Sequence, residues 1–150
     1  MPTSRKSDRW TQLVLFYLGL INAFPGLWAL SAPHSFYGSF PGLGHAWVAV
    51  YGPYNEHLVR DVGGFFVALS VLCFLTVFGR VPLSSTAICL LSFNLPHLVY
   101  HLIHLHRLLP IDQLGNVIAL SVNVLLPGLL LYVGTAGRST PATSSGQPSL

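Results

Sequence analysis

The sequence has 150 residues, of which 52% are hydrophobic and only 7% are charged, and its net charge is +3. Soluble domains carry roughly 25% charged residues, so this composition excludes an ordinary water-soluble domain and predicts a membrane protein in contact with lipid. The small positive charge gives no reason to expect nucleic acid as a partner. Cys73 and Cys89 form no Cys-x-x-Cys motif, so neither a dithiol redox centre nor a zinc ribbon is indicated.

The first apolar run covers residues 10–30 and follows a basic segment, residues 1–9, that we expect to be disordered or interfacial. A helix of this length crosses roughly 30 Å of hydrocarbon. The run is long for the core of a signal peptide, and further apolar runs follow it, so we expect an uncleaved first transmembrane helix.

A long connection, residues 31–57, comes next and is rich in glycine, proline and aromatic residues. Aromatic side chains with few charges suit the headgroup layer of a membrane, where Trp and Tyr concentrate. We therefore expect this connection to fold as an aromatic cap on one end of the helices, with a short interfacial helix near residues 45–51.

Three more apolar runs complete the predicted helices. They cover residues 58–79, 83–106 and 113–135. Asp112 is placed to cap the last helix at its N-terminus. Gly63 and Gly64 allow a close approach between helices, as small residues do in membrane bundles.

Residues 136–150 are rich in Ser, Thr, Pro and Gly, and this composition predicts a disordered tail. The fold class predicted for residues 10–135 is all-α: a transmembrane four-helix bundle with a long aromatic-rich loop between its first and second helices.

The basic residues predict the orientation of these helices, because an excess of Lys and Arg marks the cytoplasmic side. With both termini in the cytoplasm, that side holds Arg5, Lys6, Arg9, Arg80 and Arg138, and the other side holds Arg60 and Arg107. We therefore expect a multi-pass protein of the cell membrane with both termini cytoplasmic and an extracytoplasmic cap.

The third apolar run contains a histidine-rich stretch from Asn94 to His106. His97, His101 and His104 follow an i, i+4, i+7 spacing, and Asn94 lies one turn earlier, so a helix places the four side chains on one face. Polar side chains in a membrane span are costly when they face lipid. We therefore expect this face to line protein or a water-filled cavity.

Further polar residues lie at the same, outer end of the other helices. Glu56 and Arg60, and likewise His57 and Asp61, are four residues apart and can pair on a helix, and Asn116 lies near the start of the last helix. The inner half of the spans is nearly all Leu, Val, Phe, Ala and Ser. This asymmetry predicts a polar pocket in the extracytoplasmic half. The residues expected to bind a ligand there are Glu56, His57, Arg60, Asp61, Asn94, His97, His101 and His104.

Three interpretations of this pocket stay open. The first is a site for a small amphipathic ligand such as a quinone or a lipid, oriented by a polar floor. The second is a metal or haem site in a redox membrane subunit, where His97 and His101 share one ion. The third is a structural core whose polar side chains form hydrogen bonds across helices without a ligand. The expected partners are membrane lipid and a small amphipathic ligand; the sequence identifies no cofactor and no reaction.

Three segments carry a resemblance to known proteins. Residues 33–45, residues 52–63 with the string Asn-Glu-His-x-x-Arg-Asp-x-Gly, and Asn94-Leu-Pro-His97 resemble small, uncharacterised bacterial four-helix integral membrane proteins. This resemblance covers most of residues 10–135. The plan of four spans with a long first loop is also similar to DoxX-like proteins, some of which are associated with quinol oxidation or thiol stress. That likeness is one of architecture only and transfers no catalytic residue, but it slightly favours a quinone or redox function.

Overall fold

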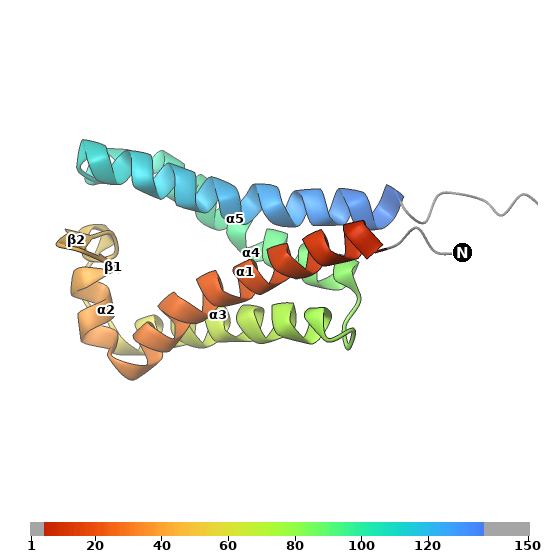
Figure 1. Ribbon diagram of the computed structural model, residues 1–150. Helices are drawn as coiled ribbons and strands as arrows, with labels where there is room; N and C mark the ends of the chain where they lie inside the picture. Colours follow the sequence, from red (N-terminus) through yellow and green to blue (C-terminus); the bar gives the residue numbers. More distant parts are fainter. Residues whose placement is uncertain (1–4, 137–150) are drawn as a thin grey trace, which may run out of the picture.

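The computed structural model describes residues 5–136, and Figure 1 shows that this part of the chain is built almost entirely from helices. The four long helices are α1 (Arg5–Ser31), α3 (Glu56–Val77), α4 (Leu83–Ile103) and α5 (Pro110–Ala136). The all-α fold predicted from the sequence is confirmed. The predicted tail, apart from Ala136, lies outside the described residues, as do residues 1–4.

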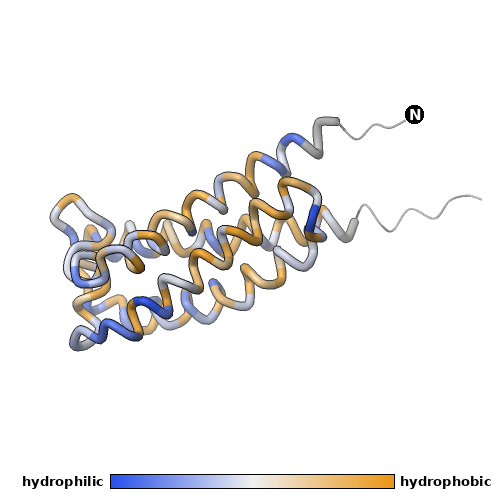
Figure 2. The backbone as a smooth tube through the Cα atoms, turned by 90° about the horizontal axis from the view of Figure 1, so that it is seen from below, coloured by the Kyte–Doolittle hydropathy of each residue, from blue (hydrophilic) through white to orange (hydrophobic). Residues whose placement is uncertain are grey.

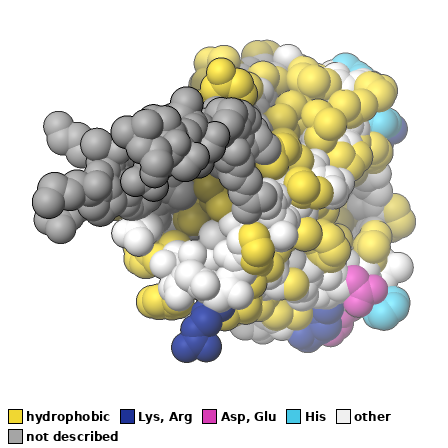
Figure 3. All heavy atoms as spheres, turned by 90° about the vertical axis from the view of Figure 1, so that its right-hand side faces the viewer, with side chains coloured by type: hydrophobic (Ala, Val, Ile, Leu, Met, Phe, Trp, Pro, Cys, Tyr) yellow, Lys and Arg dark blue, Asp and Glu magenta, His cyan; other side chains and the backbone are white. Residues whose placement is uncertain are grey.

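Four helical segments are long and apolar enough to cross a membrane: Arg9–Ser31, Glu56–Val77, Leu83–Ile103 and Pro110–Gly134. Each carries large exposed hydrophobic side chains, such as Leu13, Phe65, Leu95 and Leu125. Figure 2 shows hydrophobic residues along the whole length of the helices, and Figure 3 shows them over the face seen from the end at which α1 begins. Water-soluble proteins rarely expose so continuous an apolar surface, so this surface is the one expected of a membrane protein.

The long helices form two pairs. α1 packs along α3 and α4 packs along α5, whereas contacts between the two pairs are much sparser. Figure 1 shows the pairs close together at the end where α1 begins and separated at the other end, where the connection between α1 and α3 lies between them. The start of α1 and the end of α5 lie at the same end of the molecule.

Glycines allow the close packing of α1 on α3. A Cβ atom added to Gly63 would lie 2.9 Å from the Ala29 Cβ and 3.1 Å from the Gly26 carbonyl oxygen, and one added to Gly26 would lie 2.9 Å from the Val67 nitrogen. The prediction of a close helix approach is right for Gly63. It is wrong for Gly64, where an added Cβ would meet no atom within 4 Å.

The half of the molecule away from the connection contains polar contacts that the sequence analysis did not predict. Its buried core includes Leu15, Leu18, Leu69, Cys73 and Leu90. Next to this core, the Ser70 hydroxyl donates a 2.8 Å hydrogen bond to the Gly19 carbonyl on α1, and the hydroxyls of Thr76 and Thr86 form a hydrogen bond between α3 and α4. Serine was predicted among the residues of this half, but the sequence did not predict that small hydroxyl side chains join the helices there.

Several helix boundaries differ from the predicted ones. α1 begins at Arg5, within the segment that was expected to be disordered or interfacial, and α3 begins and ends two residues earlier than predicted. α4 ends at Ile103, because the N–H of His104 is shared between carbonyls three and four residues earlier and the chain tightens into the 3-10 turn η2 (Leu105–Arg107). α5 begins already at Pro110, since proline fits the first turn of a helix, where an N–H has no partner in the helix. Asp112 therefore lies inside the first turn and is not the N-cap that the sequence predicted.

The connection, residues 32–55, is called the cap below. It forms α2 (Pro33–Ser39), a hairpin of β1 (Pro41–Gly42) and β2 (His45–Ala46), and the 3-10 turn η1 (Ala49–Tyr51). The short helix predicted near residues 45–51 is only this single turn. α2 was not predicted, although Pro33 is a favourable residue for a helix start.

Aromatic rings hold the cap together and attach it to α1. Trp28 on α1 packs edge to face on both Phe36 and Phe40, with ring centroids 6.1 and 6.2 Å apart, and Phe40 packs in the same way on Trp47. Such pairs are worth about 0.5–1.5 kcal/mol each beyond the area that they bury. The cap is therefore a packed element and not a loose loop.

Candidate ligand-binding site

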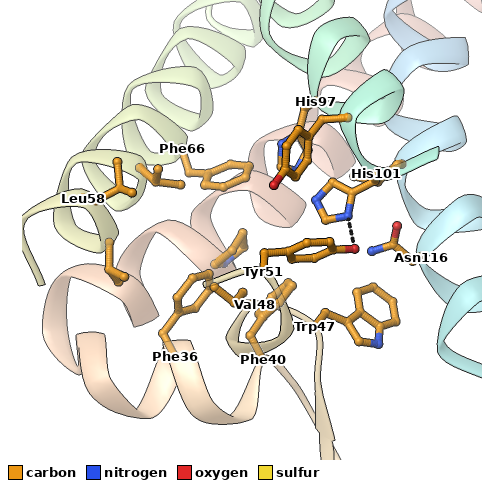
Figure 4. A pocket seen from close by; sticks show the side chains of 15 residues that line it. Phe36, Phe40, Trp47, Val48, Tyr51, Leu58, Phe66, His97, His101 and Asn116 are labelled. Carbon is orange, nitrogen blue, oxygen red and sulfur yellow. Dashed lines mark hydrogen bonds between the residues drawn. The ribbon is translucent and has the colours of Figure 1, made fainter. Parts of the chain in front are cut away.

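A cavity of about 270 Å³ lies beneath the cap, between the two helix pairs, and is called the under-cap cavity below. Most of its wall is apolar and includes Phe36, Phe40, Val48, Val59, Phe66 and Leu120. Its polar side chains include Tyr51 on the cap, His97 and His101 on α4, and Asn116 on α5 (Figure 4). Three elements that are far apart in the sequence thus bring polar groups to one part of an otherwise apolar space.

Helix α4 presents two histidines to the cavity from consecutive turns. His97 and His101 are four residues apart, and their ring centroids are 4.6 Å apart. The ring of Phe93, one turn earlier, stacks on His97 with a centroid distance of 5.3 Å. This stacking holds the His97 ring beside the cavity. The common face of the two histidines is the one that their spacing predicted.

Tyr51 joins the cap to α4. Its hydroxyl and the Nδ1 atom of His101 form a 3.0 Å hydrogen bond, drawn as a dashed line in Figure 4. Burial, and to a lesser degree the neighbouring Tyr100, raises the pKa of Tyr51 above its ordinary value. The hydroxyl is therefore protonated at neutral pH, and the wall carries a neutral phenol that is already hydrogen-bonded.

Asn116 differs from other asparagines of the long helices. The side-chain amides of Asn22, Asn94 and Asn123 each donate to the carbonyl four residues earlier, at 2.7, 2.9 and 2.9 Å. Asn116 is only 2% exposed, and its Oδ1 atom has no hydrogen-bond partner within residues 5–136. A buried acceptor without a partner costs about 1–3 kcal/mol. Figure 4 places this amide beside Tyr51 and His101, with its nitrogen toward the Tyr51 hydroxyl and its Oδ1 atom turned away. A half-turn of the amide group would direct Oδ1 toward a donor in the cavity.

The four predicted site residues of the histidine-rich stretch do not all reach the cavity. His97 and His101 line it, whereas Asn94 is buried away from it and bonds to its own helix. His104 lies at the end of α4, where its ring stacks on Tyr100 with centroids 4.2 Å apart and its Nδ1 atom bonds to the Tyr100 carbonyl at 2.8 Å. The helix ends there, so the face predicted to continue to His104 is interrupted.

The four predicted site residues of α3 pair as expected but lie outside the cavity lining. Arg60 Nε and Glu56 Oε1 are 2.8 Å apart, and His57 Nε2 and Asp61 Oδ2 are 3.4 Å apart. All four side chains are exposed, and Arg60 also donates to the carbonyl of Leu30 at the end of α1. The helical period explains this placement, because the same turns direct other side chains of α3 into the cavity: Leu58, Val59, Val62 and Phe66. The structure therefore does not group these charged residues with the histidines.

The sequence predicted a pocket beneath the aromatic cap, but no residue of the cap was included among the ligand-binding residues. In the structure Phe36, Trp47 and Tyr51 line the cavity. Asn116 was noted as an outer polar residue and was not included among the ligand-binding residues. Its spacing from Asp112, one helical turn, was the available signal, because it places both side chains on one face of α5.

Asp112 attaches the cap to α5. Its Oδ1 atom lies 2.6 Å from His45 Nδ1 and accepts a 2.8 Å hydrogen bond from Trp47 Nε1. The carboxyl group is almost completely buried and lies in the first turn of α5. Gly115 makes room for the indole, because a Cβ atom there would lie 3.1 Å from the Trp47 ring. Trp47 also lines the under-cap cavity, so this cluster positions part of its wall.

The metal or haem site that was one interpretation of the sequence requires a group of metal-ligating side chains. Within residues 5–136, no three His, Cys, Asp or Glu side chains lie together in a group that could hold a metal ion. His97 and His101 stand near each other, and the other polar side chains in the cavity wall include Tyr51, Tyr100 and Asn116.

No protein-family model, curated protein or solved structure matches this chain. The resemblance to small bacterial four-helix membrane proteins, and to DoxX-like proteins in architecture, therefore stays a prediction from the sequence.

Proposed function

We propose that this chain is an integral protein of the cell membrane that binds a small, uncharged amphipathic ligand in the under-cap cavity. Four helices long and apolar enough to span a bilayer support the membrane location. The start of α1 and the end of α5 lie at one end of the molecule, which agrees with both termini on one side of the membrane. The excess of basic residues at that end favours the cytoplasm as that side.

The observation that carries the ligand proposal is the amide of Asn116 in the wall of an apolar cavity, because its Oδ1 atom has no hydrogen-bond partner within residues 5–136. Ligand sites are mostly apolar with a few placed polar groups, and this cavity, at about 270 Å³, is close to the lower end of the usual range. A ligand that fits has an apolar, ring-sized body against the aromatic wall. It also carries one hydroxyl or N–H that donates to Asn116.

A matched pair of probes tests this proposal. We expect 4-propylphenol to bind the purified protein about tenfold more tightly than 4-propylanisole, because only the phenol can donate a hydrogen bond to Asn116. Asn116→Leu should remove this preference. It should also leave the protein as stable as the wild type, or more stable by about 1 kcal/mol, because the substitution removes a buried unpaired acceptor. Calorimetric titration in mild detergent measures the binding, and thermal unfolding measures the stability.

Asn123→Leu is the matched control, since Asn123 lies on the same helix, bonds to its own backbone and is outside the cavity lining. It should keep the preference for the phenol. A purely structural polar core predicts the reverse pattern, in which Asn116→Leu lowers the melting temperature and neither probe binds. Equal binding of the two probes to the wild type would contradict the assigned role of Asn116.

A further inference from the structure

The under-cap cavity has a mouth between α3 and α4. Two of the residues that line the cavity are well exposed: Leu58 on α3, at 59%, and Tyr100 on α4, at 46%. The residues that line it from the cap and from α1 and α5 are buried or half-buried. The open side of the cavity is therefore the side at which these two helices face each other.

The course of the two helices explains this opening. α3 and α4 are joined by a tight turn after Val77, and near that turn the hydroxyls of Thr76 and Thr86 hold them together. Phe65 and Phe66 contact Phe93 about midway along the helices. α3 and α4 belong to different helix pairs. Beyond the contact of Phe93 they diverge toward the cap (Figure 1).

The side chains around the mouth are mostly apolar, as expected for an opening toward lipid. Leu58, Val62 and Phe66 line the α3 side, and the neighbouring exposed residues on α4 are Val99 and Ile103. The exposed ion pairs in the first turns of α3 mark the level of the headgroups, because charged side chains avoid the hydrocarbon core. The mouth therefore lies at and just below the boundary between headgroups and acyl chains.

The cap closes the opposite, water-facing side. Phe36 is 4% exposed, and Phe40, Trp47 and Val48 are half-buried over the cavity. The bonds of Trp47 and His45 to Asp112 fasten this cover to α5. A ligand that came from water would have to displace a packed and hydrogen-bonded element, whereas a ligand from the bilayer meets mostly apolar side chains.

We infer that the cavity takes its ligand sideways from the bilayer, and that this ligand is an uncharged, single-chain lipid-soluble molecule with a hydroxylated head. Its head lies beside Asn116, and its apolar tail leaves between α3 and α4. A charged head does not fit, because no Lys, Arg, Asp or Glu of the described part of the chain lines the cavity. A bulky two-chain lipid does not fit a space of about 270 Å³ with its head inside. This inference rests on the proposed function.

A pair of phenols separates the head site from the path of the tail. In lipid nanodiscs containing the full chain, we expect Leu58→Trp to weaken binding of 4-dodecylphenol about fivefold, because the larger side chain displaces one or two methylene groups of the tail from an apolar contact. Binding of 4-propylphenol, which has no long tail to leave the cavity, should weaken by a clearly smaller factor, because Leu58 lines the cavity only at its exposed mouth. Leu95→Trp places the same side chain at an exposed position of α4, outside the lining, and should change the binding of neither probe.

A second measurement uses the wild-type protein. A 4-dodecylphenol that carries a photoreactive diazirine in the middle of its chain should label α3 near Leu58 and α4 near Tyr100, and excess 4-propylphenol should suppress this labelling. If 4-propylphenol binds but Leu58→Trp is silent and the label lies on α1, α5 or the cap, the sideways path is wrong and the proposed function stands. If neither phenol binds, the proposed function and this inference are both overturned.

Discussion

Gly63→Ala should lower the free energy of unfolding by about 2 kcal/mol, whereas Gly64→Ala should leave it unchanged or raise it by up to about 1 kcal/mol. The two glycines are adjacent on α3 but face different surroundings. A methyl group at Gly63 would lie 2.9 Å from the Ala29 Cβ and 3.1 Å from a backbone oxygen of α1, so the helices must move apart. A methyl group at Gly64 would meet nothing within 4 Å.

Unfolding in mixed detergent micelles with increasing sodium dodecyl sulfate, followed by circular dichroism, measures both changes. Gly26→Ala provides a test from the partner helix and should resemble Gly63→Ala, because a methyl group there would lie 2.9 Å from the Val67 backbone nitrogen. If Gly63→Ala and Gly64→Ala change stability equally, the close contact between α1 and α3 does not determine the stability of this pair.

The four long helices could be predicted from the sequence, because runs of apolar residues long enough to cross a membrane are a property of the local sequence. Their ends were less accurate. The early end of α4 at Ile103 and the early start of α5 at Pro110 depend on local backbone hydrogen bonds, which hydropathy does not describe. The pairing of α1 with α3 and of α4 with α5 was also not predictable, since it follows from tertiary packing.

The candidate site could be predicted only where its residues lie on one helix, so that their spacing in the sequence shows which side chains share a face. The spacing of His97 and His101 on α4 was enough to place both on one face, and both line the cavity. The spacing of Glu56 and Arg60 correctly predicted a pair, but not which way the pair faces. Tyr51 reaches His101 from 50 positions away in the sequence, through a cap whose path no helical or strand period describes.

The orientation in the membrane and the family resemblance stay predictions from the sequence, because they concern the surroundings and the relatives of the chain and not its contacts. Exposed ion pairs on α3 and the aromatic cap lie at one end, and the start of α1 and the end of α5 lie at the other. This polarity supplies two distinct membrane faces, and the basic residues predict which of them is cytoplasmic.

Asp112→Ala should lower the free energy of unfolding by about 3 kcal/mol, because it leaves the indole N–H of Trp47 without its acceptor in a largely buried place and removes the partner of His45. Asp61→Ala is the control. It also removes an aspartate that pairs with a histidine, but this pair is 3.4 Å long and its side chains are 88% and 61% exposed, so the expected cost is below about 1 kcal/mol. Detergent unfolding measures both variants.

The loss of stability in Asp112→Ala should be concentrated in the cap, because the carboxylate joins the cap to α5. Leu43, at the fully exposed tip of the hairpin, is a suitable cleavage site for chymotrypsin, and cleavage there should become faster in Asp112→Ala but not in Asp61→Ala.

Adding Trp47→Phe to Asp112→Ala should recover part of the lost stability, since phenylalanine has no N–H to leave unpaired. Purely additive effects of the two substitutions would show that Asp112 does not act through Trp47. Because Trp47 lines the under-cap cavity, Asp112→Ala should also weaken the binding of 4-propylphenol, which links the attachment of the cap to the proposed function.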